Sequence, residues 1–266
     1  MRSTYLRDQF DLYGRQIIGL GLLVVLLCTV LRSTAQDRSS LNLPFFDNQK
    51  LHYGFLIGIG VSRFQMDYAD RYISPDLDTL HSVVPSGNVG FKLGFVVDYH
   101  FHDVFDVRLT PTVSFNQFKL DYRYTDGSKI ESLSDPTFIE MPLVMKYKSI
   151  RRENSRMYLL AGINPAFKVS GTKEKQDETE RLLIRNFNLS LEFGAGFDEY
   201  QEMFKFSPEV RYTWGLMNML DKSKPSFYSD PIDRLTVHTI TFYVTFEGGP
   251  SELKVGGKGK GKKRRR

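Results

Sequence analysis

The histidines are the residues of this chain whose chemistry suits catalysis or metal binding. His100 and His102 alternate on a strand, so their rings share one face, but a single pair beside a turn is a weak metal signal. His238 is isolated near the opposite ends of the strands, where a catalytic site would need a nucleophile, a base and an orienting group. No glycine-rich phosphate loop leads from a strand into a helix. The sequence therefore predicts no enzyme, no metal site and no cofactor.

A second set of candidates consists of charged side chains on the polar faces of alternating strands. We expect these faces to line a narrow interior, where charges must pair because desolvation costs several kcal/mol for each ion. A structural ion-pair network is the favoured interpretation, and a substrate site remains the alternative. The six residues are Arg108, Glu140, Lys146, Glu192, Glu209 and Arg211.

The elements that carry these charges show a period of two. From residue 87 to 101, one face reads Phe91, Leu93, Phe95, Val97 and Tyr99, whereas the other is small, polar or charged. Successive side chains of a strand point to opposite faces, so this stretch predicts a strand with one apolar side. A mean hydropathy of −0.31 excludes a bundle of membrane-spanning helices. The alternation recurs in eight segments: 53–62, 87–101, 105–116, 139–146, 158–167, 187–198, 205–214 and 239–246.

The connections alternate between long and short. Predicted loops at 69–87, 123–136, 171–185 and 216–234 are long, whereas 102–103, 148–155 and 199–203 are short. This order is typical of outer-membrane barrels, which have long outer loops and tight periplasmic turns. Most segments reach the ~9–11 residues that a tilted strand needs to cross a bilayer. We therefore predict an all-β fold, an eight-stranded antiparallel up-and-down transmembrane β-barrel with both termini in the periplasm.

A soluble sandwich or lipocalin-like barrel also alternates. Three features favour a membrane barrel over a soluble fold. The polar faces are rich in Gly, Ser and Thr, which suits a crowded interior. Aromatic pairs such as Tyr99/Phe101 and Tyr212/Trp214 lie near strand ends, as in an interfacial belt. The last strand ends on Phe246 in an alternating apolar pattern.

The two ends of the chain differ from the body. Arg2, Arg7 and Arg15 precede a 15-residue apolar run, 17–31, and Ser33-Thr34-Ala35 offers a cleavage site. Residues 1–35 are therefore predicted to be a signal peptide, with an uncleaved anchor as the alternative. Its Cys28 is the single cysteine, so no disulfide framework is expected.

The mature chain divides into a periplasmic segment at 36–50, the barrel at 51–247 and a disordered basic tail at 248–266. Residues 251–266 hold eight Lys plus Arg and one Glu, a net charge of +7. In the periplasm such a tail suits peptidoglycan or an acidic partner rather than nucleic acid, although a solvated end without a partner is as consistent.

Three stretches resemble the PorT family of Bacteroidetes. They are the start, Leu43-Pro44-Phe45-Phe46-Asp47 with the strand from Lys50 to Gly58, then residues 138–143, and then residues 208–216. The resemblance spreads over about 40–250. It implies an outer-membrane accessory of type IX secretion and gliding motility, whose partners are outer-membrane lipids and other secretion components. The alternative is a stand-alone surface barrel that binds ligands or adheres through its outer loops.

An apolar cluster without strand alternation lies in the periplasmic segment. Exposed aromatic residues beside proline can act as interface hot spots. We therefore expect a periplasmic partner to contact Leu43, Pro44, Phe45 and Phe46. In the alternative interpretation, Phe45 and Phe46 close the lower mouth of the barrel.

Overall fold

The computed structural model describes residues 41–69, 80–170, 184–221 and 231–248. The predicted signal peptide and nearly all of the basic tail lie outside these residues. Among the described residues, no helix is long and apolar enough to cross a membrane. One short 3₁₀ helix, η1 (Phe46–Asn48), precedes the first strand.

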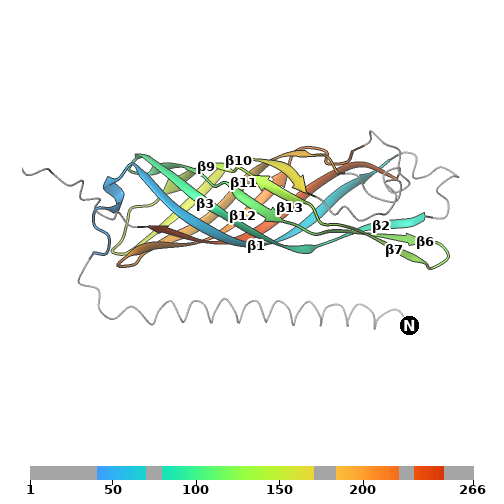
Figure 1. Cartoon of the computed structure of the whole chain (residues 1–266), viewed down its shortest axis with the longest axis horizontal. Coiled ribbons are helices and arrows are strands. Elements are labelled where there is room, and N and C mark those ends of the chain that lie inside the picture. Colours follow the sequence, from blue (N-terminus) through green and yellow to red (C-terminus); the bar gives the residue numbers. More distant parts are fainter. Residues whose placement is uncertain (1–40, 70–79, 171–183, 222–230, 249–266) are drawn as a thin grey trace, which may run out of the picture. The chain divides into compact units, whose positions relative to one another are not determined.

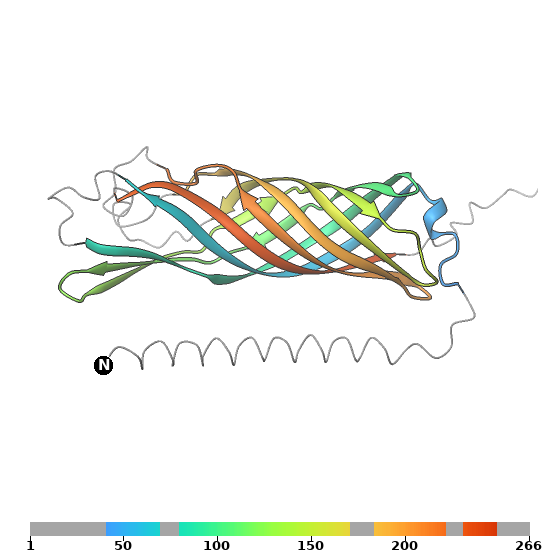
Figure 2. The same ribbon diagram turned by 180° about the vertical axis from the view of Figure 1, so that it is seen from behind.

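The strands close into a ring (Figures 1 and 2). The first strand pairs antiparallel with β3 on one side and with β13 on the other, from Leu51↔Tyr99 and Gly54↔Glu247 onward. The order then runs through β12, β11 and β10 to two walls that are each made of two short strands. The predicted eight-stranded antiparallel barrel is thereby confirmed. Its strands are β1 (Leu51–Tyr68), β3 (Asn88–His102), β4 (Phe105–Leu109), β5 (Thr112–Phe115), β8 (Thr137–Glu140), β9 (Leu143–Lys148), β10 (Ser155–Ser170), β11 (Phe187–Tyr200), β12 (Phe204–Gly215) and β13 (Ile232–Gly248).

Two walls are interrupted at prolines. Pro111 separates β4 from β5, and Pro142 separates β8 from β9. Proline lacks the N–H that a ladder needs, so the regular pairing stops there. The carbonyls of both prolines still accept bonds, from Phe95 N–H and Thr110 N–H, each at 3.0 Å. Each pair of short strands therefore acts as one wall.

A second sheet is built in part from residues where the sequence predicted loops. Strands β2 (Leu80–Ser86), β6 (Phe118–Tyr124) and β7 (Lys129–Ser134) form a separate three-stranded sheet. The predicted loops at 69–87 and 123–136 are therefore wrong in part. The physical reason is that β2 runs into β3, β5 into β6 and β7 into β8. Three walls continue past the rim instead of ending at it.

The two faces of the barrel have opposite chemistry. Odd-numbered residues of β3 such as Phe91 and Phe95 are exposed on the exterior, whereas Lys92 and Asp98 are buried inside. Small interior residues make room for large ones. A Cβ on Gly58 would lie 2.6 Å from the Tyr243 ring. The predicted assignment of apolar faces outward and polar faces inward agrees with this structure.

The two ends of the barrel also differ (Figures 1 and 2). The tight connections β3–β4, β9–β10 and β11–β12 lie at the end that carries η1, which we call the short-turn end. The second sheet extends from the opposite end, the long-loop end. Every candidate site described below belongs to one of these ends or to the interior between them.

Candidate functional site

Arg108 lies at the centre of the interior charge network. Its guanidinium donates to Asp98 at 2.7 Å, to Glu247 at 2.8 Å and to Glu209. Four different walls supply these groups, because β3, β4, β12 and β13 all turn their polar faces inward. Arg108 and all three carboxylates are at most 1 % exposed. The residue therefore bridges the interior from wall to wall.

The network continues from Arg108 in two directions. Glu209 also forms an ion pair with Arg211, whose guanidinium lies 3.3 Å from the Glu192 carboxylate. Glu247 also receives Lys205 at 2.7 Å. A neighbouring pair, Lys146 and Asp198, lies at 2.9 Å. This part of the interior is thus lined by side chains of alternating charge that pair with one another.

Nearer the long-loop end of the barrel, Glu140 belongs to a separate group of buried side chains. It accepts from Lys92 at 2.8 Å and from the amide of Asn164 at 3.0 Å. All three side chains are at most 6 % exposed. Lys92 and Glu140 therefore neutralise each other on the long-loop side of the larger network.

The structure buries all six charged residues that the sequence singled out, and each has a partner of opposite charge. Five others belong to the same networks and were not included in the prediction: Lys92, Asp98, Asp198, Lys205 and Glu247. The same pattern could have identified them, because each occupies a position on the polar face of its alternating strand. Glu247 comes one residue after the end assigned to the last strand.

Phe46 closes the short-turn end. Its ring is 1 % exposed, stacks on His52 at 4.1 Å and meets the edge of Tyr200 at 5.7 Å. The ammonium of Lys205 lies 4.7 Å from the ring centroid, so the ring covers the lower side of the charge network. Phe46 is therefore a stopper in the mouth of the barrel.

Hydrogen bonds to the neighbouring Asp47, which we call the latch, hold Phe46 in this position. Asp47 accepts two bonds from Arg156, at 3.0 and 3.1 Å, and one from the Tyr200 hydroxyl at 3.2 Å. Burial alone would raise the pKa of the Asp47 carboxyl, but Arg156 and other nearby cations, together with Tyr200, lower it below its ordinary value. Arg151 also donates to the carbonyls of Asn42 and Leu43. The segment before β1 is thereby fixed to two of the short turns.

Asp47→Asn should weaken the latch at neutral pH. Because the pKa of Asp47 is lowered in the folded state, its carboxylate stabilises the fold above its unfolded pKa, and this contribution is lost as pH falls through the folded pKa. The stability difference between wild type and Asp47→Asn should therefore be fully present at about pH 7 and shrink as the pH falls below the ordinary aspartate pKa of about 3.9. Chemical unfolding of both proteins across this range measures it. A difference that is independent of pH would mean that the latch does not depend on the Asp47 charge.

The structure separates the four residues that were expected to contact a partner. Phe45 is 70 % exposed and Pro44 is exposed, whereas Leu43 is partly buried. Phe46 is buried inside the chain and cannot serve as an exposed contact. Phe46 thus lies in the mouth of the barrel, where the alternative interpretation places it, and the contact of Phe45 with a partner stays a prediction.

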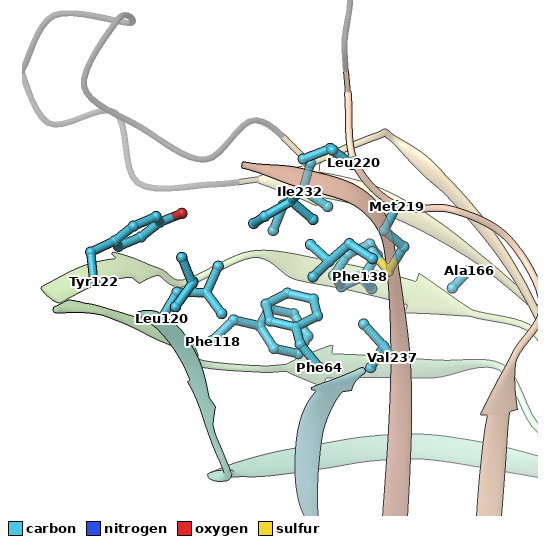
Figure 3. Packing of buried hydrophobic residues seen from close by; sticks show 13 residues of the cluster. Phe64, Phe118, Leu120, Tyr122, Phe138, Ala166, Met219, Leu220, Ile232 and Val237 are labelled. Carbon is cyan, nitrogen blue, oxygen red and sulfur yellow. The ribbon is translucent and has the colours of Figure 1, made fainter. Parts of the chain in front are cut away.

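An apolar cluster fills the long-loop end (Figure 3). Phe64 from β1 and Phe118 from β6 pack at 4.5 Å between ring centroids, together with other residues of the second sheet and the start of β13. Sequence reasoning missed this cluster because its members come from distant segments, and several lie in predicted loops. Its members are Phe64, Val83, Phe118, Leu120, Tyr122, Phe138, Ala166, Ile184, Met219, Leu220, Ile232, Leu235 and Val237.

The histidines do not assemble a catalytic or metal site. His52 supports Phe46, His100 contacts Asp106 at 2.7 Å, and His238 shares a hydrogen bond of 2.8 Å with the Tyr212 hydroxyl. In the described parts of the chain, no three His, Cys, Asp or Glu side chains are placed to hold a metal ion.

Comparison with known proteins gives the family. A model described as the outer membrane protein beta-barrel domain matches residues 34–221. No curated protein sequence matches the chain. Among solved structures, OprG of Pseudomonas aeruginosa is 16 % identical, covers 76 % of this chain and 98 % of its own, and has a TM-score of 0.45. Neisserial surface protein A is 10 % identical, with coverage of 74 % and 97 % and a TM-score of 0.39.

The family match spans well over half of the chain, and the ring of eight strands has the apolar exterior that a bilayer requires. The short-turn end is accordingly the periplasmic end, and the long-loop end faces outward. This chain belongs to the outer membrane protein beta-barrel domain family and is a β-barrel of the outer membrane.

Proposed function

We propose that this barrel is a closed accessory of protein export, which braces other envelope components and neither conducts cargo nor catalyses a reaction. The observation that carries the proposal is the Arg108 network, which joins four walls across the interior. Eight strands enclose a space just wide enough to be filled by side chains. Phe46 adds a second closure at the periplasmic mouth.

A closed interior predicts that the purified barrel conducts no ions. Inserted into a planar lipid bilayer, it should give no stable current steps, because water and ions find no continuous path past Arg108 and Phe46. A sixteen-stranded porin, reconstituted in the same way, is the positive control. Reproducible steps from this protein would overturn the closed-barrel proposal.

The type IX assignment rests on the resemblance of three stretches to PorT-family proteins. The periplasmic end supports a contact role there, because Phe45 projects beside the short turns. Ile150 and Met203 in those turns are 83 % and 82 % exposed. Exposed apolar residues on one end suit a protein partner. Peptidoglycan or an acidic protein is the proposed contact of the basic tail, which lies beyond the described residues.

Phe45→Ala should impair export of type IX cargo while the barrel still assembles. Loss of an interface hot spot costs about 2 kcal/mol or more, which weakens the contact roughly 30-fold. The assay compares cargo secretion from a gene deletion strain complemented with wild type, with Phe45→Ala or with Ile130→Ala. Ile130 is an exposed apolar residue of the second sheet and serves as the matched control.

The same assay also shows which end of the barrel carries the surface needed for secretion. If Ile130→Ala blocks secretion and Phe45→Ala does not, the working surface is the outer one. If the gene deletion leaves secretion intact, the export role is wrong, and the surface-barrel alternative gains support. The apolar cluster at the outer mouth is the observation that favours this alternative.

A further inference from the structure

A slot opens in the barrel wall between β1 and β2. Strand β1 pairs with β3 only up to Ser62↔Asn88. Beyond that point β2 pairs with β6, and no backbone pair joins β1 to β2 among the described residues. The Tyr68 hydroxyl donates to the Val83 carbonyl at 2.9 Å and spans the slot near its outer part.

The slot is a groove of about 460 Å³ at the edge of the lipid-facing band. Its lining combines Phe64, Met66 and Val83 with the polar Arg63 and Gln65. On the exterior of β1 the run of alternating apolar residues ends at Val61, and the exposed Arg63, Gln65 and Asp67 follow, so the groove lies at the outer membrane interface. Its size falls within the range of about 300–1,000 Å³ that small-molecule sites occupy.

Phe64 and Phe118 separate this groove from a second space inside the barrel. Phe64 lines the groove, whereas Phe118 lines an interior cavity of about 30 Å³. The two rings are in contact at 4.5 Å (Figure 3). Met219, whose unbranched side chain adapts readily, lines the cavity beside them. A modest shift of these side chains would join the two spaces.

The cavity has a polar floor. Lys92 and Glu140 neutralise each other there, and Asn164 donates its amide to Glu140 at 3.0 Å. This bond orients the amide, so that the Asn164 side-chain oxygen has no donor while the residue is 98 % buried. The Asn188 side-chain oxygen on the same floor also lacks a partner. A buried acceptor without a donor is costly, so the floor favours a group that donates.

We propose that the outer mouth binds a single-chain amphiphile with a hydrogen-bond-donating head, such as a hydroxyl. The head occupies the polar cavity against Asn164, and the chain passes between Phe64 and Phe118 into the slot. Lys92 is already neutralised by Glu140, so a carboxylate head gains no free cation. The inference is independent of the export proposal, because it concerns the opposite end of the barrel.

The test uses the full mature barrel in nanodiscs of phosphatidylcholine. The probe is decan-1-ol that carries a photoreactive diazirine on its chain, and mass spectrometry maps the labelled residues. Labels are expected on Phe64, Phe118 and Met219. Unlabelled decan-1-ol should compete about tenfold better than 1-methoxydecane or decanoate, because only the alcohol donates to Asn164. Labels confined to lipid-facing residues such as Phe91 and Phe242 would overturn the proposal.

Variants test the polar floor separately. Asn164→Leu should abolish the preference for the alcohol over 1-methoxydecane. Thr241→Val is the control, because Thr241 is equally buried inside the barrel but does not line the cavity. If Asn164→Leu does not fold, the competition series on the wild-type protein decides alone. Equal competition by all three compounds would contradict the proposed head site.

Discussion

Replacing Arg108 with methionine should lower the free energy of unfolding by about 3–5 kcal/mol, because three buried carboxylates lose their shared cation. Asp98, Glu209 and Glu247 are at most 1 % exposed and come from three other walls. Methionine replaces the aliphatic stem of the side chain but lacks the guanidinium, so the effect chiefly reports the loss of the shared cation. Urea unfolding in lipid vesicles, followed by the gel shift between folded and unfolded barrel, measures the change.

Two further variants define the result. Arg152→Met removes an exposed arginine from a short turn and should change stability by no more than about 0.5 kcal/mol. Arg108→Lys keeps the charge but loses the planar fork, so it should fall between wild type and Arg108→Met. If Arg108→Met is as stable as Arg152→Met, the interior is hydrated, and the closed-barrel proposal fails.

Phe46→Ala should cost about 3–5 kcal/mol of stability, whereas Phe45→Ala should cost almost nothing. The neighbours differ because Phe46 is 1 % exposed against His52 and Tyr200, and Phe45 is 70 % exposed. Truncation of Phe46 also uncovers Lys205 at the base of the charge network. Unfolding midpoints of the two variants in the same vesicles provide the comparison.

The same two variants distinguish an effect on folding from an effect on export. Phe46→Ala should make the segment before β1 easier to cleave by protease, since its packing is lost. Phe45→Ala should leave cleavage unchanged and act on export alone. Equal stability of the two variants would mean that Phe46 leaves the mouth readily, and that η1 is not a stopper.

The alternation of side chains was enough to predict the barrel and the orientation of its charges. Parity along each strand assigns Arg108 and Glu209 to the interior without any knowledge of their neighbours. It does not assign partners, because a contact such as Arg108 to Glu209 joins residues 101 positions apart and depends on the register of several strands. The pairings therefore required the structure.

The second sheet and the apolar cluster show a different limit. Phe118, Leu120 and Tyr122 alternate with charged residues, but this run follows a predicted strand so closely that it was not counted separately. The cluster combines it with Phe64, Ile232 and other residues that meet only through the fold. The slot between β1 and β2 likewise arises because two adjacent walls diverge, and no local pattern marks that divergence.

The pairing of β1 with β13 also bears on how the barrel is made. Glu247, near the end of the last strand, supplies a carboxylate to both Arg108 and Lys205, and its residue pairs with Gly54 at the start of the first strand. Until this final strand arrives, the two cations lack one of their counter-charges, and the polar face stays open to water. Contacts of such sequence separation form late, because loop closure must precede them. We therefore expect one late step of assembly, in which the last strand closes the ring and the interior charges lose their water and pair together.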